Sequence, residues 1–238
     1  MINGKTIAAM IPARMGSERL RQKNLVLLND RPLIGYAVEA AKDSEIFDRI
    51  VVNSDGKVFE EIAREYEVDF YLRDQEVANS QARADEVVND FILNNKTDVI
   101  VWVNPTSPLQ TGQEIRRAVE CFFDNNFDTL ISTKVEQVHC NFGGKPLNYK
   151  LDEPFAKTQD LVGVERFVYS VMMWRVQEFL REYQAKRHAF FVGKVGFFPV
   201  SKLASIIVKT KEDVELCKYI IEGQKQAGKL EYYKSGGR

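Results

Sequence analysis

The sequence predicts an α/β fold built on a doubly wound, mostly parallel sheet. Apolar runs alternate with segments of helical periodicity over the first ~135 residues, as expected for strands joined by right-handed helical crossovers. Residues 99–103 (VIVWV) are apolar throughout, which is typical of a strand covered by helices on both faces. Polar, turn-forming loops at residues 10–24, 73–78 and 104–108 follow three of the expected strands. Such loops meet beyond the carboxyl ends of the strands, where ligands bind.

The elements follow from short apolar runs and from apolar residues at helical spacing. The expected strands lie at residues 6–11, 49–53, 68–72, 98–103, 129–133, 167–174, 195–199 and 204–208. The expected helices lie at residues 32–41, 55–67, 81–94, 112–125 and 212–226. We expect Pro12 to end the first strand, because proline cannot donate to a sheet ladder. Pro32 is expected to open the first helix and Asp55 to cap the second.

Composition is that of an ordinary globular protein, with 45% apolar and 28% charged residues, and the 238 residues fit a single domain over 1–238. A net charge of −1 gives no global attraction to nucleic acid or to a membrane surface. No apolar run approaches the ~20 residues of a membrane span. The N-terminal residues lack the layout of a signal peptide, and the three cysteines (Cys121, Cys140 and Cys217) do not suggest a disulfide framework. We therefore expect a cytoplasmic protein.

The regular pattern breaks at residues 137–160, where glycine and proline punctuate a stretch that also carries apolar residues. A structureless run of this length in a compact domain needs a reason. Apolar residues on an extended arm often form an interface, so we expect a dimerisation arm. The alternative is a surface excursion that packs on its own subunit. Residues 234–238 are expected to form a disordered tail.

The loop at residues 10–24 is the strongest candidate for a binding site. Gly16 and Ser17 allow a close approach of the backbone to a ligand, and the cations Arg14, Arg19, Arg21 and Lys23 lie within ten residues. A small-residue turn that leaves a strand can form an anion-binding concavity, so this loop suits a polyphosphate. The alternative is a basic surface loop, since a run of charge is usually a solvated face. Three loops on one rim of the sheet favour the site.

The motifs of these loops resemble those of the cytidylyltransferases that activate sialic acid and related 2-keto sugar acids. The first motif is I-P-A-R-x-G-S-x-R-x-x-x-K-N, at residues 11–24. Three further segments match the family in order and spacing: L-R-D-x-E-V-A at 72–78, N-P-T-S-P-L at 104–109 and K-T-Q-D-L at 157–161. The resemblance covers most of the chain. It implies a Rossmann-like nucleotide-diphospho-sugar transferase architecture.

The resemblance also implies an activity and a set of site residues. The enzyme would join CTP to a sialic-acid-like 2-keto sugar acid, giving a CMP-sugar and pyrophosphate, with Mg²⁺ as cofactor and as a homodimer. Residues implied to bind the nucleotide are Ala13, Arg14, Gly16, Ser17, Lys23, Asn24 and Arg73, with Arg14 and Lys23 catalytic. Residues implied to bind the sugar acid are Asn104, Thr106, Ser107, Gln159 and Asp160, the last two from the partner subunit.

The chain departs from the family pattern at three places. The family carries an aspartate pair before its last helix to hold magnesium, and Ile207 and Lys209 stand in place of that pair. Asn104 stands where the family commonly has glutamine, and the strand near residues 167–170 (FVYS) lacks the family's N-G-A. Three hypotheses follow: an active enzyme, an impaired relative that binds a nucleotide or nucleotide sugar as a regulatory or scaffolding protein, or a nucleotidyltransferase for another base or sugar. The metal position is left unassigned.

Overall fold

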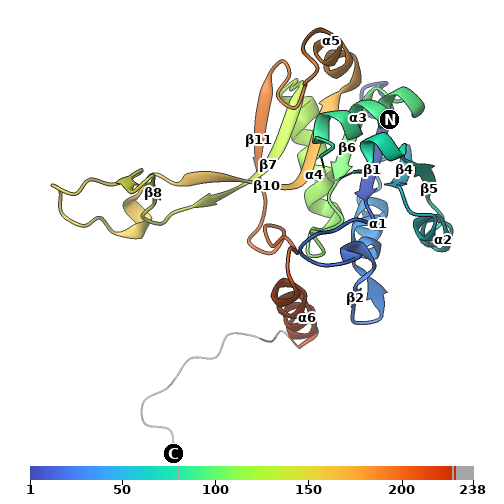
Figure 1. The fold of residues 1–238 in the computed structure, drawn as a ribbon. Helices are drawn as coiled ribbons and strands as arrows, with labels where there is room; N and C mark the ends of the chain where they lie inside the picture. The colour runs from blue at the N-terminus through green and yellow to red at the C-terminus, as the bar shows by residue number, and fades with distance from the viewer. Residues whose placement is uncertain (80, 227, 229–238) are drawn as a thin grey trace, which may run out of the picture.

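The main sheet has seven strands in the order β11-β7-β10-β6-β1-β4-β5 (Figure 1). The computed structural model describes residues 1–79, 81–226 and 228. Across the sheet, the strands are β11 (Val195–Pro199), β7 (Thr129–Glu136), β10 (Val164–Arg175), β6 (Val99–Val103), β1 (Ile7–Ala13), β4 (Arg49–Ser54) and β5 (Asp69–Leu72). Only β10 runs antiparallel to its neighbours, so the described sheet is mostly parallel as the sequence predicts.

Helices cover both faces of this sheet. One face carries α1 (Leu33–Asp43), α2 (Val58–Glu65) and α4 (Gly112–Asp124), and the other carries α3 (Ala84–Asn94) and α5 (Val176–Lys186). The alternation of side chains along β1 shows the division, because Ala9 and Ile11 join the first core cluster while Met10 joins the second. Both faces are therefore apolar, which explains the uninterrupted apolar runs in the sequence.

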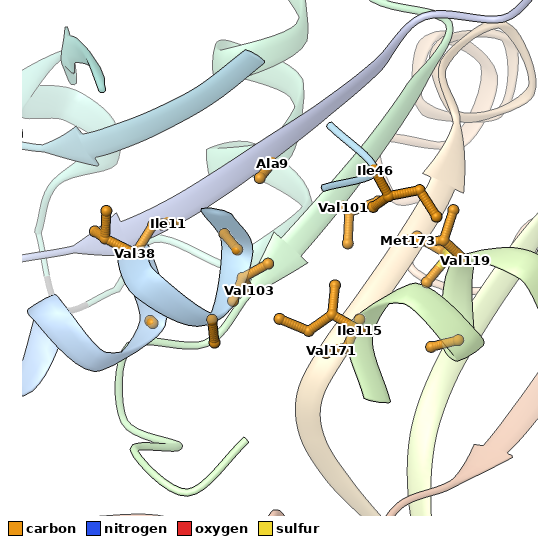
Figure 2. Packing of buried hydrophobic residues seen from close by; sticks show 14 of the residues in the cluster. Ala9, Ile11, Val38, Ile46, Val101, Val103, Ile115, Val119, Val171 and Met173 are labelled. Carbon is orange, nitrogen blue, oxygen red and sulfur yellow. The ribbon is translucent and has the colours of Figure 1, made fainter. Parts of the chain in front are cut away.

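Figure 2 shows the first core cluster, where α1 and α4 pack on β1, β6 and β10. Val38 and Ile115 meet a layer of strand residues that includes Val101, Val103 and Met173. These side chains are almost completely removed from solvent. Each contributes about 1.5–3 kcal/mol relative to an exposed position, so this layer fixes the helices against the sheet.

The last helix, α6 (Lys211–Lys225), lies beside a small hairpin rather than on the sheet. The hairpin strands are β2 (Leu27–Leu28) and β3 (Arg31–Pro32). A separate apolar cluster joins these parts through Leu28, Leu109, Val208, Val214 and Cys217. Because the hairpin follows the loop at residues 10–24, this cluster ties α6 to the candidate binding loop.

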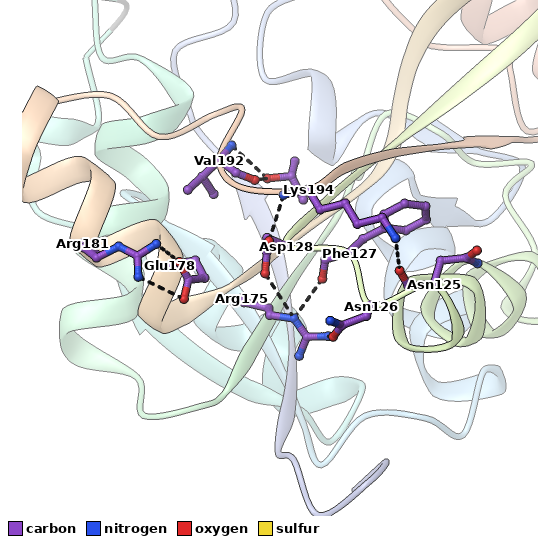
Figure 3. A network of polar contacts seen from close by, with 10 residues as sticks. Asn125, Asn126, Phe127, Asp128, Arg175, Glu178, Arg181, Val192 and Lys194 are labelled. Carbon is purple, nitrogen blue, oxygen red and sulfur yellow. Dashed lines mark hydrogen bonds and ion pairs between the residues drawn. The ribbon is translucent and has the colours of Figure 1, made fainter.

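A network of polar contacts fastens the other end of the sheet, where β7 and β11 begin (Figure 3). Arg175 lies 3.5 Å from Asp128 and donates to the Phe127 carbonyl at 2.9 Å. The second oxygen of Asp128 accepts from the Lys194 N–H at 2.8 Å. These contacts hold the connection into β11 against β7, at the end of the sheet opposite to the carboxyl ends of β1 and β6.

Residues 137–160 form part of an arm that extends away from the body (Figure 1). Within the arm lie the two-stranded β8 (Asn141–Phe142) and β9 (Lys145–Pro146) and the 3₁₀ turn η3 (Thr158–Asp160). Phe142 is 80% exposed, Leu151 80% and Phe155 83%. The arm thus projects from the body and exposes apolar side chains, and its role in dimerisation stays a prediction.

Some sequence predictions of local structure are wrong. β1 continues through Pro12 to Ala13, because its pairing with β6 ends at Met10 and Pro12 pairs only with β4. Helix α2 is preceded by Lys57 rather than capped by Asp55, whose carboxylate accepts from the Met15 N–H at 2.9 Å.

Residues 204–208 form no strand. The segment is anchored by the buried side chains of Ala204 and Val208, and a short apolar run fits such a segment as well as a strand. Helix α5 was not predicted, although Val176, Phe179 and Tyr183 lie on its buried face at helical spacing. The expected tail at residues 234–238 lies outside the described residues.

Candidate active site

The candidate site lies where the order of the strands reverses. β4 and β5 lie on one side of β1 and β6 lies on the other, so a crevice opens beyond the carboxyl ends of β1 and β6. A cavity of about 340 Å³ occupies this position. Its lining comes from four separated parts of the chain: the loop after β1, a segment from Arg73 to Val87, the end of β6 and Lys209. The three loops expected on one rim therefore meet at one cavity.

The loop after β1 places its polar side chains along the cavity. Arg14, Ser17, Arg19 and Lys23 line it, and the Ser17 N–H donates to the Met15 carbonyl at 3.1 Å in a tight turn. The 3₁₀ turn η1 (Lys23–Leu25) then follows Gln22, which has a left-handed backbone with φ of 49°. The Met15 N–H donates to Asp55 Oδ1, and this hydrogen bond joins the loop to the end of β4. A fixed turn with several cations suits the charge and shape of a phosphate chain.

Asn24, the last residue of this loop, is buried and only 4% exposed. It lines the cavity, and its Oδ1 finds no hydrogen-bond donor among the described residues. A buried acceptor without a partner costs free energy, so it calls for a donor from solvent or from a ligand. The observation therefore fits a position that a ligand completes.

Lys23 carries its charge in an unfavourable environment. Its pKa is lowered from the ordinary value of 10.5, first by burial and then by the neighbouring charges of Arg19, Arg14 and Lys209, with Asp213 acting in the opposite direction. Among the ion pairs formed by the described residues, none includes any of these four cations. A polyanion would supply the missing negative charge.

Arg73 is the most deeply buried cation of the cavity, with 5% of its surface exposed. Its Nε donates to Asn53 Oδ1 at 2.8 Å, and its Nη2 donates to the Asn53 carbonyl at 3.0 Å. Burial lowers the pKa of Arg73 to about 10, against the opposing charges of Asp55 and Asp90. The guanidinium therefore stays protonated near neutral pH, held in one orientation at the edge of β4 and β5.

Asn104 and Thr106 line the cavity at the end of β6, but the Asn104 amide is already engaged. Its Nδ2 donates to the Tyr169 carbonyl at 3.1 Å. Its Oδ1 accepts from the Thr106 N–H at 3.0 Å and from the Thr106 hydroxyl at 2.9 Å. Asn104 thus shapes this wall and positions Thr106.

Tyr169 lies at an irregularity of β10 between Phe167 and Met172. Its φ is 61°, an unusual value for an aromatic residue. This conformation turns the Tyr169 carbonyl toward Asn104, with which it forms the hydrogen bond described above. The irregular strand is therefore part of the wall of the cavity.

Five of the sequence-predicted residues do not line this cavity. Ala13 is buried in β1, Ser107 is 1% exposed, and Gly16 lines a neighbouring hollow on the other side of the loop. Gln159 and Asp160 are exposed on the arm in η3. In this chain alone the arm does not bring them to the cavity, which leaves their predicted placement in a partner's site as a prediction.

Sequence reasoning did not assign several residues that line the cavity. Glu18, Arg19, Asn79 and Trp102 belong to this group. Arg19 belongs to the cation cluster visible in the sequence, so its charge was the available signal. Trp102 belongs to an apolar strand, and no sequence pattern distinguishes it from a core residue.

The side chains at the cavity offer few protein ligands to the Mg²⁺ that the resemblance implies. Among the described residues no group of three or more His, Cys, Asp or Glu could hold a metal ion. Ile207 packs against the main core, and Lys209 lines the cavity. A hard cation requires oxygen ligands, which neither side chain provides.

A cation-lined cavity at the reversal point of a doubly wound sheet defines an α/β protein suited to a nucleotide or another phosphorylated ligand. The chain belongs to the cytidylyltransferase family, whose model matches residues 8–212. The predicted cytidylyltransferase family is thereby confirmed, and acylneuraminate cytidylyltransferases are among the curated proteins that the chain resembles.

Three curated relatives illustrate the family. The chain is 37% identical to the N-acylneuraminate cytidylyltransferase of Escherichia coli O18:K1:H7 over 117 residues, 49% of this chain and 28% of that protein. It is 26% identical to the N-acylneuraminate cytidylyltransferase of Streptococcus agalactiae serotype V over 219 residues, 86% of this chain and 50% of that protein. It is 35% identical to the CMP-N,N'-diacetyllegionaminic acid synthase of Legionella pneumophila over 120 residues, 48% of this chain and 52% of that protein. The chain spans about half the length of these relatives, or less.

A solved structure supports the fold. A CMP:2-keto-3-deoxy-manno-octonic acid synthetase, complexed with CTP, superposes with a TM-score of 0.69 at 13% identity, covering 92% of this chain and 99% of the other. In the ranges that the structure describes, no helix is both long and apolar enough to cross a membrane.

Proposed function

We propose that this chain is a cytidylyltransferase that joins CTP to a sialic-acid-like 2-keto sugar acid. The observation that carries the proposal is the cavity at the reversal point of the sheet, lined by the cations of the family motif without ion-pair partners in the described chain. Family membership supports CTP as the nucleotide. The names of the relatives support a nonulosonic acid or a similar 2-keto acid as the acceptor.

The reaction is an in-line displacement at the α-phosphorus of CTP. The oxygen of the sugar's anomeric hydroxyl forms a bond to this phosphorus, and the bond from the α-phosphorus to the oxygen bridging to the β-phosphate breaks. Pyrophosphate leaves with the electron pair, and the hydroxyl proton passes to solvent. Catalysis of such a transfer depends on positioning and on charge neutralisation.

The cations of the cavity take the nucleotide side of this reaction. Arg14, Ser17 and Lys23 bind the β- and γ-phosphates, where the turn after β1 presents both side chains and backbone N–H groups. Asn24 and the fixed guanidinium of Arg73 orient the nucleotide. Each contact also stabilises the charge that develops on the departing pyrophosphate.

The acceptor lies at the end of β6. Thr106 is positioned there by Asn104, whose Oδ1 accepts from the Thr106 hydroxyl. Gln159 and Asp160 approach the sugar from the partner subunit of a homodimer formed through the arm. The exposed apolar side chains of the arm support such an interface.

The test is pyrophosphate release by the purified chain with CTP and a panel of acceptors. The panel contains an N-acylneuraminic acid, diacetyllegionaminic acid and 2-keto-3-deoxy-manno-octonic acid, with a 2-keto acid lacking the sugar as the control. We expect release with CTP and at least one sugar acid, and a CMP-sugar product by mass spectrometry.

Other results separate the alternative functions. Binding of CTP without release from any acceptor contradicts the enzyme and supports a nucleotide-binding regulatory protein. Release with UTP, ATP or GTP in place of CTP contradicts the assignment of the base. Absence of both binding and release contradicts every nucleotide function of the cavity.

A further inference from the structure

Hydrogen bonds fix the backbone of Lys209 at the rim of the cavity. The preceding residue, Val208, is fully buried and donates its N–H to the Thr106 carbonyl at 2.8 Å. The N–H groups of Lys209 and Thr210 donate to Asp213 Oδ2 at 2.8 and 2.9 Å. The backbone on both sides of Lys209 is therefore fixed, one side to the loop after β6 and the other to the start of α6.

The Lys209 side chain faces the cations of the β1 loop. It lines the same cavity as Arg14, Arg19 and Lys23, and its charge is close enough to contribute to the lowered pKa of Lys23. No carboxylate within 4.0 Å forms an ion pair with Lys209 among the described residues. The repulsion between Lys209 and the other cations raises the free energy of the empty cavity, and this cost is partly offset by solvent around the exposed Lys209 and by the nearby charge of Asp213. A bound polyphosphate reverses the sign of this contribution.

The carboxylates near Lys209 are not arranged for a divalent ion. Asp213 is occupied by the N–H groups of Lys209 and Thr210 and by the Thr210 hydroxyl. Burial raises the pKa of this carboxyl, but these hydrogen bonds outweigh burial and lower it overall. Glu18 is exposed on the opposite loop of the cavity. Of the two carboxylates, Asp213 is thus already occupied by hydrogen bonds, and Glu18 alone would provide a divalent ion with only one side-chain ligand.

We propose that the Lys209 ammonium contacts the triphosphate of the bound nucleotide and supplies, at this rim, the positive charge that a divalent ion would otherwise supply. This rests on the proposed function, because it takes CTP as the ligand. An ammonium group neutralises phosphate oxygens as a compact point charge with three donors. Nucleotide binding by this chain therefore does not require a divalent ion at the rim.

The first experiment is calorimetric titration with CTP in EDTA and in excess magnesium. The test variant is Lys209→Met, which keeps a long side chain and removes the charge. The matched control is Lys211→Met, since Lys211 begins α6 two residues away and does not line the cavity. Circular dichroism checks that both variants fold.

We expect native affinity for CTP to change less than about threefold between the two buffers. Lys209→Met should weaken binding in EDTA about tenfold, as expected for one charge-assisted phosphate contact, while Lys211→Met stays within about twofold of native. Native binding that requires magnesium, or equal affinity in the native chain and Lys209→Met, overturns the proposal. Nucleotide binding absent from the native chain in both buffers overturns this proposal and the proposed function together.

A second variant reverses the chemistry. Ile207→Asp with Lys209→Asp places two carboxylates at the rim and removes its cation. We expect CTP binding by this double variant to become magnesium-dependent, with affinity lost in EDTA and recovered in magnesium, and pyrophosphate release to become more dependent on magnesium than in the native chain. Affinity that is equal in both buffers for the double variant contradicts the proposed equivalence. CTP binding without pyrophosphate release from any sugar contradicts the proposed transferase activity. The affinities of the native chain and the Lys209 variants for CTP still test the role of Lys209 in that case.

Discussion

At the scale of single residues, the cavity stores unfavourable electrostatics that a ligand relieves. Arg73 and Lys23 are both cations whose pKa is lowered mainly by burial. Arg73 is compensated by the Asn53 side chain and carbonyl, and it is therefore fixed. Lys23 has only the distant charge of Asp213 to oppose its cationic neighbours. Of the two, Lys23 has more to gain from phosphate.

Lys23→Ala should weaken CTP binding at least about tenfold, because it removes a charged phosphate contact while leaving the packed core untouched. Calorimetric titration measures the loss, with circular dichroism as the control for folding. Unchanged affinity in a folded variant would return the loop after β1 to the status of a basic surface.

The lowered pKa of Lys23 predicts a pH dependence. A bound triphosphate favours the charged ammonium, so the pKa rises on binding and CTP is bound with uptake of protons at alkaline pH. Affinity should fall as pH rises through the pKa of the free chain, which lies below 10.5. Titrations in two buffers of different ionisation enthalpy measure the uptake, and Lys23→Ala should reduce it.

The same shift has the opposite sign for folding. The unfolded chain binds more protons than the folded chain between the two pKa values of Lys23, so this residue makes folding less favourable at lower pH. Its penalty is relieved as pH rises toward the unfolded value. A measured proton release on CTP binding would contradict this account of Lys23.

At the scale of elements, the junction of α1 and α4 depends on a missing side chain. A Cβ at Gly112 would meet the Asp43 backbone and the Ser44 nitrogen at 2.7 Å. Gly112→Ala should therefore destabilise the fold by about 1–3 kcal/mol, since an overpacked contact between backbones has no flexible side chain to yield. Urea unfolding measures the change.

The matched control is Gly223→Ala in α6, where an added Cβ meets nothing within 4 Å. Alanine there should stabilise the helix by about 0.5–1 kcal/mol. Equal effects of the two substitutions would show that helix propensity, and not the close approach, determines the cost at Gly112.

The elements also show what sequence patterns can predict. Residues 99–103 and 50–52 are uninterrupted apolar runs, so their strands and the parallel fold could be predicted from the sequence alone. The apolar residues of helix α5 recur at helical spacing, as in the helices that were predicted. The helix begins directly after β10, so no turn residues in the sequence mark its start. Residues 204–208 have the composition of a strand, yet tertiary anchoring by Val208 decides their conformation.

The candidate site divides in the same way. Its cations at 14, 19 and 23 are close in sequence, and charge clustering made them visible. Asn104 carries a family motif, but its hydrogen bond to the Tyr169 carbonyl depends on a backbone irregularity 65 residues away. Contacts set by a single irregular φ leave no periodic pattern in a sequence.

At the scale of the whole molecule, the exposed arm predicts a homodimer. Sedimentation at micromolar concentration should show a dimer for the native chain and a shift to monomer for Phe142→Lys with Leu151→Lys, which places charge on the apolar arm. Leu93→Lys is the matched control, since Leu93 is also exposed but lies on α3 outside the arm. A native chain that is monomeric would remove the basis for placing Gln159 and Asp160 in a shared site.

The hydrogen bond from Val208 to the Thr106 carbonyl has a consequence for the order in which the protein is made. All seven strands of the main sheet are complete at Pro199, before Lys209 leaves the ribosome. A nascent chain arrested before Val208 can therefore form the sheet but lacks one cation of the cavity and the bond that anchors it. We expect arrested chains to retain CTP more weakly until Lys209 and α6 have emerged, a property that capture of stalled ribosomes on immobilised CTP would measure. The segment made after the strands of the sheet is then the part that completes the CTP site.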